Sequence, residues 1–355
     1  MKKVFILLLI SIVFFSCSSS DEIVNSKWTF IACEGNYGAS NGSIYMINQF
    51  GQVDSVMEVG DVVQSLKVHN NKLFVIVNNS HKIMAYDISP NGLSLPGIEV
   101  NTENSSPREM AIADDKLYFT NWNSKDIKYL DLINYTVNTL VELNGLPEDI
   151  ISKGNKLFFT INMNEDYSSS DQVISYDIDD NKIDKTYTVG KGPLNLAFRN
   201  NDLFISNTYY DESYNSFHGT SRIDNNDNIK IIDYGKDSPC GGSIHNIDNI
   251  MYRSAYGGIV EIDDNLELMI NNKIGSFTQS EVYSIDTDGD NIYFGLTDYS
   301  KKNEVKILNI QSGSVQTYNV GIIPGDFAFW KNNNLQATLK HAVSTMYHLV
   351  TVVLY

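Results

Sequence analysis

The amino-acid sequence predicts an all-β protein built from repeated units, and three observations support this. A strand rich in apolar and aromatic residues returns along the chain, as in LFVIV at 73–77 and LYFT at 117–120. A strand with alternating apolar residues follows each copy after a polar loop, as in KIMAYDI at 82–88. No stretch of comparable strength has helical periodicity.

The repeat has a measurable period. Aligning the copies on the first apolar residue of the recurring strand gives the anchors Trp28, Leu73, Leu117, Leu157, Leu203, Ile250 and Ile292. Their separations are 45, 44, 40, 46, 47 and 42 residues. Such a period is typical of β-propeller blades, because no blade buries both faces of its sheet alone. Seven anchors therefore predict a seven-bladed β-propeller.

One unit illustrates the four strands expected in each blade. PREMAIAD at 107–114 is the inner strand and leads into a tight turn. KLYFT, IKYLDL and TVNTLVEL then follow as the second, third and outer strands. Alternation gives each strand two usable faces, which suits sheets stacked around an axis.

The two ends of the repeat region are expected to complete one mixed blade. Inner strands begin near residues 64, 107, 147, 193, 241, 280 and 324. The strand from Trp28 to Ala32 has no inner strand before it, and the inner strand from Pro324 to Lys331 has no outer strands after it. Pairing these two leaves no unpaired sheet edge in the ring, which is therefore expected at 28–331.

The segments outside the ring carry separate predictions. Residues 1–16 place two lysines before an apolar run, which is typical of a secretory leader and too short for a membrane-spanning helix. Cys17 resembles the lipidation site of bacterial lipoproteins, followed by a polar tether to residue 27; an ordinary leader with an incidental cysteine is the alternative. For residues 332–355, a docked helix or strand, a partner contact and a translated frameshift are all open interpretations.

The amino-acid composition limits the classes of partner that this protein can bind. The 355 residues are 42% hydrophobic and 11% aromatic, enough for a large core. The 43 acidic and 26 basic residues give a net charge of -17, which repels nucleic acid and anionic lipid. We therefore expect a monomeric ring that does not bind nucleic acid and meets the membrane only through its lipid anchor. Cys33 and Cys240 are more easily interpreted as small buried side chains than as a disulfide framework.

Motifs for catalysis or metal binding are missing from the sequence. The six histidines are scattered, and HExxH, CxxC and GxGxxG do not occur. DTDGD at 286–290 resembles the start of a calcium loop, but Thr297 stands where the twelfth-position acid belongs, so a hairpin turn is expected. The sequence predicts no enzyme. Axial carboxylates, Glu148 with Glu281 or Asp326, are the alternative basis for a lyase or hydrolase.

The loops between second and third strands are expected to share one face with the outer-to-inner connections. These loops are long and polar-aromatic, as in NTYYDESYNSFHGTS at 207–221. The aromatic residues expected around this face are Tyr37, Trp122, Tyr167, Tyr209, Tyr210, Tyr214, Phe217, Tyr256 and Tyr299. Such rings stack on a sugar or a corrin while nearby amides bond its polar groups; packing between blades is the alternative role.

The starts of the inner strands predict a second, polar ring nearer the axis. Its members are Gln64, Arg108, Glu148, Asn195, Ser243, Glu281 and Asp326. Mixed donors and acceptors would orient a neutral polar ligand. A solvated channel whose charges pair across the axis is the alternative.

Several stretches resemble known families. LFVIVNN with KIMAYDI, and YTVGKGPLNLAF, resemble YVTN or YncE-like seven-bladed propellers. IACEGNYGASNGSIYMI and the following VGDVVQSLKVHNNKLFVIVNNSHKI are similar to exported lipoproteins that sit beside TonB-dependent transporters, some of which capture cobalamin.

The resemblance implies a lipid-anchored protein on the surface of the outer membrane, with the periplasm as the alternative. It implies a corrinoid ligand and a TonB-dependent outer-membrane transporter as partner. No cofactor is expected. A protein-interaction platform in the cell envelope is a further alternative.

Overall fold

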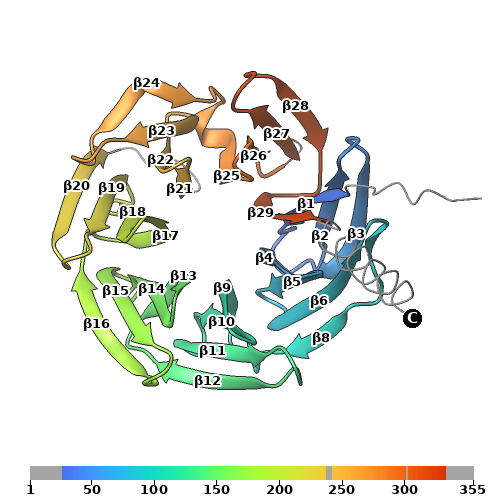
Figure 1. Cartoon of the computed structure of the whole chain (residues 1–355), viewed down its shortest axis with the longest axis horizontal. Coiled ribbons are helices and arrows are strands. Elements are labelled where there is room, and N and C mark those ends of the chain that lie inside the picture. Colours follow the sequence, from blue (N-terminus) through green and yellow to red (C-terminus); the bar gives the residue numbers. More distant parts are fainter. Residues whose placement is uncertain (1–25, 237–241, 301–302, 333–355) are drawn as a thin grey trace, which may run out of the picture. The chain divides into compact units, whose positions relative to one another are not determined.

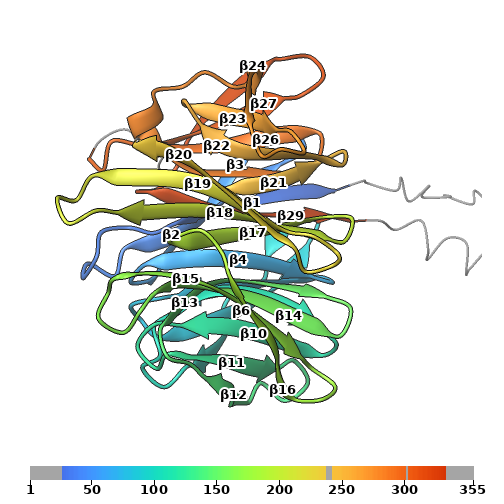
Figure 2. The same cartoon turned by 90° about the vertical axis from the view of Figure 1, so that its left-hand side faces the viewer.

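The computed structural model describes residues 26–236, 242–300 and 303–332. The predicted leader, Cys17, the tail and Cys240 lie outside the described residues. Residues Lys27–Lys331 form one compact unit. Seven antiparallel sheets stand around the axis of this unit (Figure 1), and Figure 2 shows the same ring from its side. The predicted all-β, seven-bladed propeller is confirmed.

Four blades occupy the first part of the ring, and in each the strands run in order from the axis outward. Blade 1 is β29(Pro324–Lys331), β1(Lys27–Cys33), β2(Gly42–Asn48) and β3(Val53–Gly60). Blade 2 is β4(Val63–His69), β5(Lys72–Val77) and β6(Lys82–Ser89), with β7(Gly92–Leu93) and β8(Ile98–Asn101) outside. Blade 3 is β9(Pro107–Ala113), β10(Lys116–Asn121), β11(Asp126–Asp131) and β12(Val137–Glu142). Blade 4 is β13(Leu146–Lys153), β14(Lys156–Met163), β15(Ser169–Asp177) and β16(Lys182–Thr188).

Three blades complete the circle. Blade 5 is β17(Pro193–Arg199), β18(Asp202–Tyr210), β19(Ser216–Ile223) and β20(Ile229–Lys236). Blade 6 is β21(Ile244–Ile247), β22(Ile250–Ala255), β23(Gly258–Ile262) and β24(Leu268–Ile274). Blade 7 is β25(Val282–Thr287), β26(Asn291–Thr297), β27(Asn303–Asn309) and β28(Val315–Asn319), preceded by a short 3-10 turn, Gln279–Glu281.

Blade 1 closes the ring as predicted. β1 pairs antiparallel with β29 over its whole length, and Ile31 lies opposite Phe327. β29 therefore supplies the inner edge that the first repeat lacks. The backbone groups of both ends are satisfied within one sheet.

Blade 2 departs from the expected single outer strand. Two short strands, β7 and β8, both pair with β6. Pro96 lies in the connection between them. Because proline has no N–H to donate to a ladder, the outer strand is interrupted there.

The core lies between neighbouring blades. One cluster joins Phe74 and Ile83 of blade 2 to Leu117 and Phe119 of blade 3, all of them buried. Burial of one aromatic side chain of this size stabilises the fold by about 1.5–3 kcal/mol. Each sheet therefore buries an apolar face against the next sheet, as the alternating strands require.

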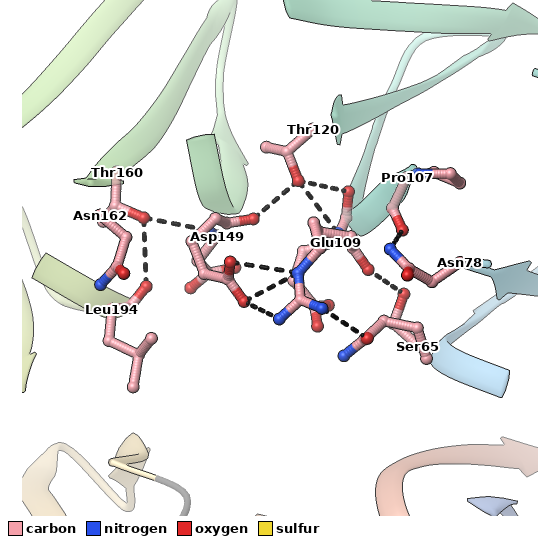
Figure 3. Close-up of polar contacts among 12 residues, drawn as sticks. Ser65, Asn78, Pro107, Glu109, Thr120, Asp149, Thr160, Asn162 and Leu194 are labelled. Atoms are coloured by element: carbon pink, nitrogen blue, oxygen red, sulfur yellow. Dashed lines mark hydrogen bonds and ion pairs between the residues drawn. The ribbon is translucent and has the colours of Figure 1, made fainter. Parts of the chain in front are cut away.

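Buried hydroxyl groups join successive inner strands (Figure 3). The Thr120 hydroxyl accepts a hydrogen bond from the Glu109 N–H at 3.0 Å and donates to the Glu148 carbonyl at 2.7 Å. Thr160, one blade further, accepts from the Asp149 N–H at 3.0 Å and donates to the Leu194 carbonyl at 3.2 Å. These bridges fix the inner strands relative to one another, and so hold the axial side chains in place.

Replacing Thr120 by valine should lower the free energy of unfolding by about 2–4 kcal/mol, because it strands a buried N–H and a buried carbonyl. Urea unfolding with an unchanged m-value measures the loss. Thr186→Val on the exposed outer strand β16 is the control, expected within about 0.5 kcal/mol of the parent chain. Equal effects of the two changes would contradict the bridging role.

Candidate functional site

The loops between second and third strands share one face with the outer-to-inner connections. The Leu143 N–H donates to the Lys125 carbonyl at 2.8 Å, and the Phe277 N–H donates to the Gly257 carbonyl at 2.8 Å. Each bond joins a loop between second and third strands to an outer-to-inner connection. We call this side the loop face, and the opposite side, which carries the hairpin turns, the turn face.

A cavity with a volume of about 750 Å³ lies on the loop face over blades 4 and 5. Its lining residues are Asn162, Met163, Tyr167, Ser168, Ser169, Lys191, Thr208, Tyr209, Tyr210, Asp211, Glu212 and Tyr214. We call it the tyrosine pocket. Two of the predicted ligand residues, Tyr209 and Tyr210, meet there.

Tyr209 forms a fixed wall of the tyrosine pocket. Its ring stacks on Phe217 with a centroid distance of 5.2 Å and an interplanar angle of 13°. Its hydroxyl donates to the Asp233 carboxylate at 2.5 Å, and this bond, together with burial, raises the pKa of Tyr209 to about 12. The Lys191 ammonium lies 5.8 Å from the ring centroid. Tyr209 therefore stays a neutral, oriented ring.

Two tight turns present the other tyrosines of the pocket. In one turn the Asp211 carboxylate accepts the Ser213 N–H at 2.9 Å and the Asn215 N–H at 2.8 Å. Tyr214 stands in this turn with φ 59° and 88% of its surface exposed. Tyr167 occupies the matching turn over blade 4 with φ 64° and 72% exposed. Bulky side chains rarely adopt this left-handed backbone conformation, which favours glycine or asparagine.

The second cavity lies on the axis and has a volume of about 420 Å³. Six predicted residues line it: Gln64, Arg108, Glu148, Asn195, Ser243 and Asp326. Glu281 does not line it, because that residue belongs to the 3-10 turn before β25, and Tyr283 lines the cavity instead. Glu148 and Glu281 therefore do not meet in this cavity. Charged or titratable lining residues that the sequence analysis did not single out are Glu34, Lys67, Glu109, Asp149, His245, Tyr283 and Asp286.

Arg108 organises one side of the axial cavity. Its Nη2 donates to Glu148 Oε1 at 2.6 Å, its Nε lies 3.2 Å from both oxygens of Glu148, and its Nη1 donates to Gln64 Oε1 at 2.7 Å. The guanidinium carbon lies 4.4 Å from the ring centroid of Trp122. Burial works against the charged form, but the Glu148 carboxylate outweighs it and raises the pKa of Arg108. These charges pair between neighbouring blades rather than across the axis.

Carboxyl groups dominate the rest of the axial cavity. Burial raises the pKa of Asp149 and of Asp326 to about 6, although each accepts a backbone N–H from the next blade. Burial, with Asp326 nearby, raises the pKa of Asp286 to about 7. Burial and neighbouring carboxylates also raise the pKa of Glu109 well above its usual value. Burial lowers the pKa of His245 to about 4, so this imidazole is neutral at pH 7.

The remaining predicted aromatic residues do not line either cavity. Tyr299 packs edge-to-face on Tyr283 at 5.9 Å between centroids, and the Tyr283 hydroxyl donates to Glu34 Oε1 at 2.6 Å. Tyr37 is 81% exposed, and Tyr256 is exposed on another loop of the same face. The aromatic side chains thus form one pocket, a border beside the axial cavity, and isolated exposed rings.

Several other sequence predictions can be compared with the described residues. Residues 288–290 form the turn between β25 and β26, as expected. Within the described ranges, no group of three or more His, Cys, Asp or Glu side chains is placed to hold a metal ion. Cys33 is buried with a free thiol, and burial raises its pKa to about 12. In the same residues no helix has the length and apolarity to cross a membrane.

Comparisons with known proteins support the fold. No family model matches the chain, and no curated protein matches it in sequence. A protein of unknown function from Desulfotomaculum acetoxidans is similar in structure, with a TM-score of 0.61, 14% identity, and coverage of 85% of this chain and 98% of the other.

Two further structures are similar at 12% identity. A hypothetical selenium-binding protein from Sulfolobus tokodaii has a TM-score of 0.60 and coverage of 88% of this chain and 94% of its own. Citrobacter koseri AztD has a TM-score of 0.55, with coverage of 87% and 99% respectively. At this identity the similarity establishes the propeller fold.

Proposed function

We propose that this protein is an exported ligand-binding propeller that takes a small polar ligand with a flat ring surface in the tyrosine pocket. The observation that carries the proposal is the placement of Tyr167 and Tyr214. Both hold exposed aromatic rings on left-handed backbone positions beside one cavity. Backbone strain of this kind costs about 1–3 kcal/mol per residue and is concentrated at functional sites.

The chemistry of the tyrosine pocket suits such a ligand. Its volume lies within the range of about 300–1,000 Å³ that is usual for small-molecule sites. Tyr209 offers a fixed ring for stacking. Asn162, Lys191 and Glu212 together offer hydrogen-bond donors and acceptors. Mixed polar groups around aromatic walls favour a neutral ligand with many hydrogen-bonding groups, such as a corrinoid or a sugar.

A corrinoid is our first candidate, on the resemblance to exported lipoproteins that accompany TonB-dependent transporters. The leader and Cys17 support a lipid anchor at the outer membrane, with the chain at the cell surface or in the periplasm. In this proposal the ring passes its ligand to an outer-membrane transporter. The second candidate is a partner platform, that is, a loop face that binds another protein of the cell envelope. The isolated exposed side chains of Tyr37 and Tyr256 favour it.

Titration of the mature chain with cyanocobalamin and with a panel of glycans tests the proposal. We expect saturable binding of one class, weakened about 30-fold or more by Tyr209→Ala, because stacked aromatic residues are typical binding hot spots. Tyr37→Ala, outside the pocket, is the control and should leave binding unchanged. If no corrinoid binds, a corrinoid is excluded as the ligand. If the glycans do not bind either, the partner platform is favoured.

A further inference from the structure

The axial cavity carries an excess of negative groups. Its carboxyl-bearing lining residues are Glu34, Glu109, Glu148, Asp149, Asp286 and Asp326. Against these six stand two cations, Lys67 and Arg108, and Arg108 is already engaged by Glu148. The neutral His245 adds no positive charge at pH 7. A ligand that enters this cavity therefore meets a field that favours cations.

Some polar groups in the axial cavity lack a partner within the described residues. Ser243 is only 6% exposed, lines the cavity, and its hydroxyl makes no hydrogen bond. His245 Nε2 is also buried without a partner. The Glu109 carboxyl group gains no hydrogen bond, while Asp149, Glu148 and Asp326 all raise its pKa. Buried polar groups are normally paired, so the walls of the axial cavity hold polar groups that the chain leaves unsatisfied.

The size of the axial cavity and its geometry decide between a metal ion and an organic cation. No set of its carboxylates is arranged to hold a metal ion in the described chain. Its volume of about 420 Å³ falls in the range of about 300–1,000 Å³ typical of sites for organic molecules. Five of the six carboxyl groups come from β9, β13, β25 and β29, and Glu34 directly follows β1, so they face the axis from several sides.

We propose that the axial cavity binds a small organic cation carrying two or more ammonium groups, a polyamine being the simplest case. Ammonium groups at separate points of one flexible chain can meet Asp149, Asp286 and Glu109 at once. This site is separate from the tyrosine pocket, and the two hypotheses stand or fall independently.

The proposed site should depend on pH. The charged or titratable groups facing it are Glu34, Lys67, Arg108, Glu109, Glu148, Asp149, His245, Tyr283, Asp286 and Asp326. Asp149 and Asp326 have pKa values of about 6 and Asp286 of about 7, so all three become mostly charged as the pH rises to 8. The ligand keeps its charge in this range. Affinity should therefore rise from pH 5 to pH 8.

Calorimetric titration of the full chain with spermidine at constant ionic strength tests the proposal. We expect saturable binding that weakens at least tenfold in the double variant Glu109→Gln with Asp286→Asn. The control double variant, Asp54→Asn with Glu142→Gln, changes two exposed carboxylates and should bind as the parent chain does. Lys67→Ala removes a competing cation and should tighten binding.

Three results would overturn the proposal. One is no saturable spermidine binding above a sodium chloride control. Another is equal weakening in the cavity and control variants, which would indicate diffuse attraction to an acidic surface. The third is saturable binding of magnesium or calcium without any for spermidine. If the double variant does not fold, Glu109→Gln alone provides the comparison, because the side chain of Glu109 has no hydrogen bond to lose among the described residues.

Discussion

Replacing Arg108 by methionine is expected to lower the free energy of unfolding by about 3–5 kcal/mol. The change leaves the Glu148 carboxylate, whose side chain is only 9% exposed, without the guanidinium that binds it through Nε and Nη2. It also removes the cation that packs on Trp122. An uncompensated buried charge destabilises the fold more than the loss of the ion pair itself. The unpaired Glu148 carboxylate therefore accounts for most of the expected loss of stability.

Chemical denaturation of three variants separates these contributions. The double variant Arg108→Met with Glu148→Met should recover most of the stability, because no buried charge is stranded. Lys72→Met breaks an exposed pair with Asp87 and should cost less than about 1 kcal/mol. A single variant no less stable than the Lys72 control, or a double variant no better than the single, would contradict the description of the Arg108–Glu148 pair.

Ending the chain at Ile323 should abolish cooperative folding of the ring. This truncation removes β29, which pairs with β1 from Lys27 to Cys33 and buries Phe327 and Trp330. It leaves β1 as an unpaired inner edge and exposes the apolar contacts of two blades. Losing a single buried large aromatic residue already costs about 3–5 kcal/mol, which is comparable to the whole stability of many domains.

Thermal melting followed by circular dichroism, with size-exclusion chromatography, measures the effect of this truncation. A chain that ends at Asn332 is the control and retains every strand of the ring. It should melt in one transition as a monomer. A chain ending at Ile323 that melts cooperatively at the same temperature would show that closure by β29 is dispensable.

The ring could be predicted from the sequence because its signals are local. Each second strand repeats an apolar run after a turn, and the inner strands begin with similar residues at regular spacing. Closure followed from two incomplete units at the ends, which β1 and β29 indeed complete. The division of the outer strand of blade 2 has a local cause in Pro96, but its consequence for pairing with β6 was not predicted.

The axial cavity was predicted only in part, because side chains at successive positions of an inner strand reach it. Arg108 and Glu109 are neighbours in sequence, yet both line the cavity. A choice of one residue for each strand therefore missed Glu109 and Asp149. Glu281 was placed two residues too early, since the 3-10 turn shifts the start of β25 to Val282. The available signal was two adjacent polar residues after the inner-strand proline, Arg108 with Glu109 and Glu148 with Asp149.

The tyrosine pocket depends on loop backbone that composition does not specify. The sequence shows many loop tyrosines, but only the turns around Asp211 and Asn164 bring Tyr214 and Tyr167 to one cavity. Trp122 instead packs on Arg108, and Tyr299 on Tyr283. Aromatic content alone could not separate these roles, because stacking on a ligand and packing on a neighbour need the same side chain.

Amide hydrogen exchange with and without a bound corrinoid or glycan tests most directly whether the tyrosine pocket is the ligand site. We predict slower exchange in the turns at 164–168 and 211–215, with no change in the turn-face hairpins at 178–181 and 224–228 of the same blades. Protection of those hairpins, or unchanged exchange at 164–168 and 211–215 while ligand is bound, would contradict this assignment.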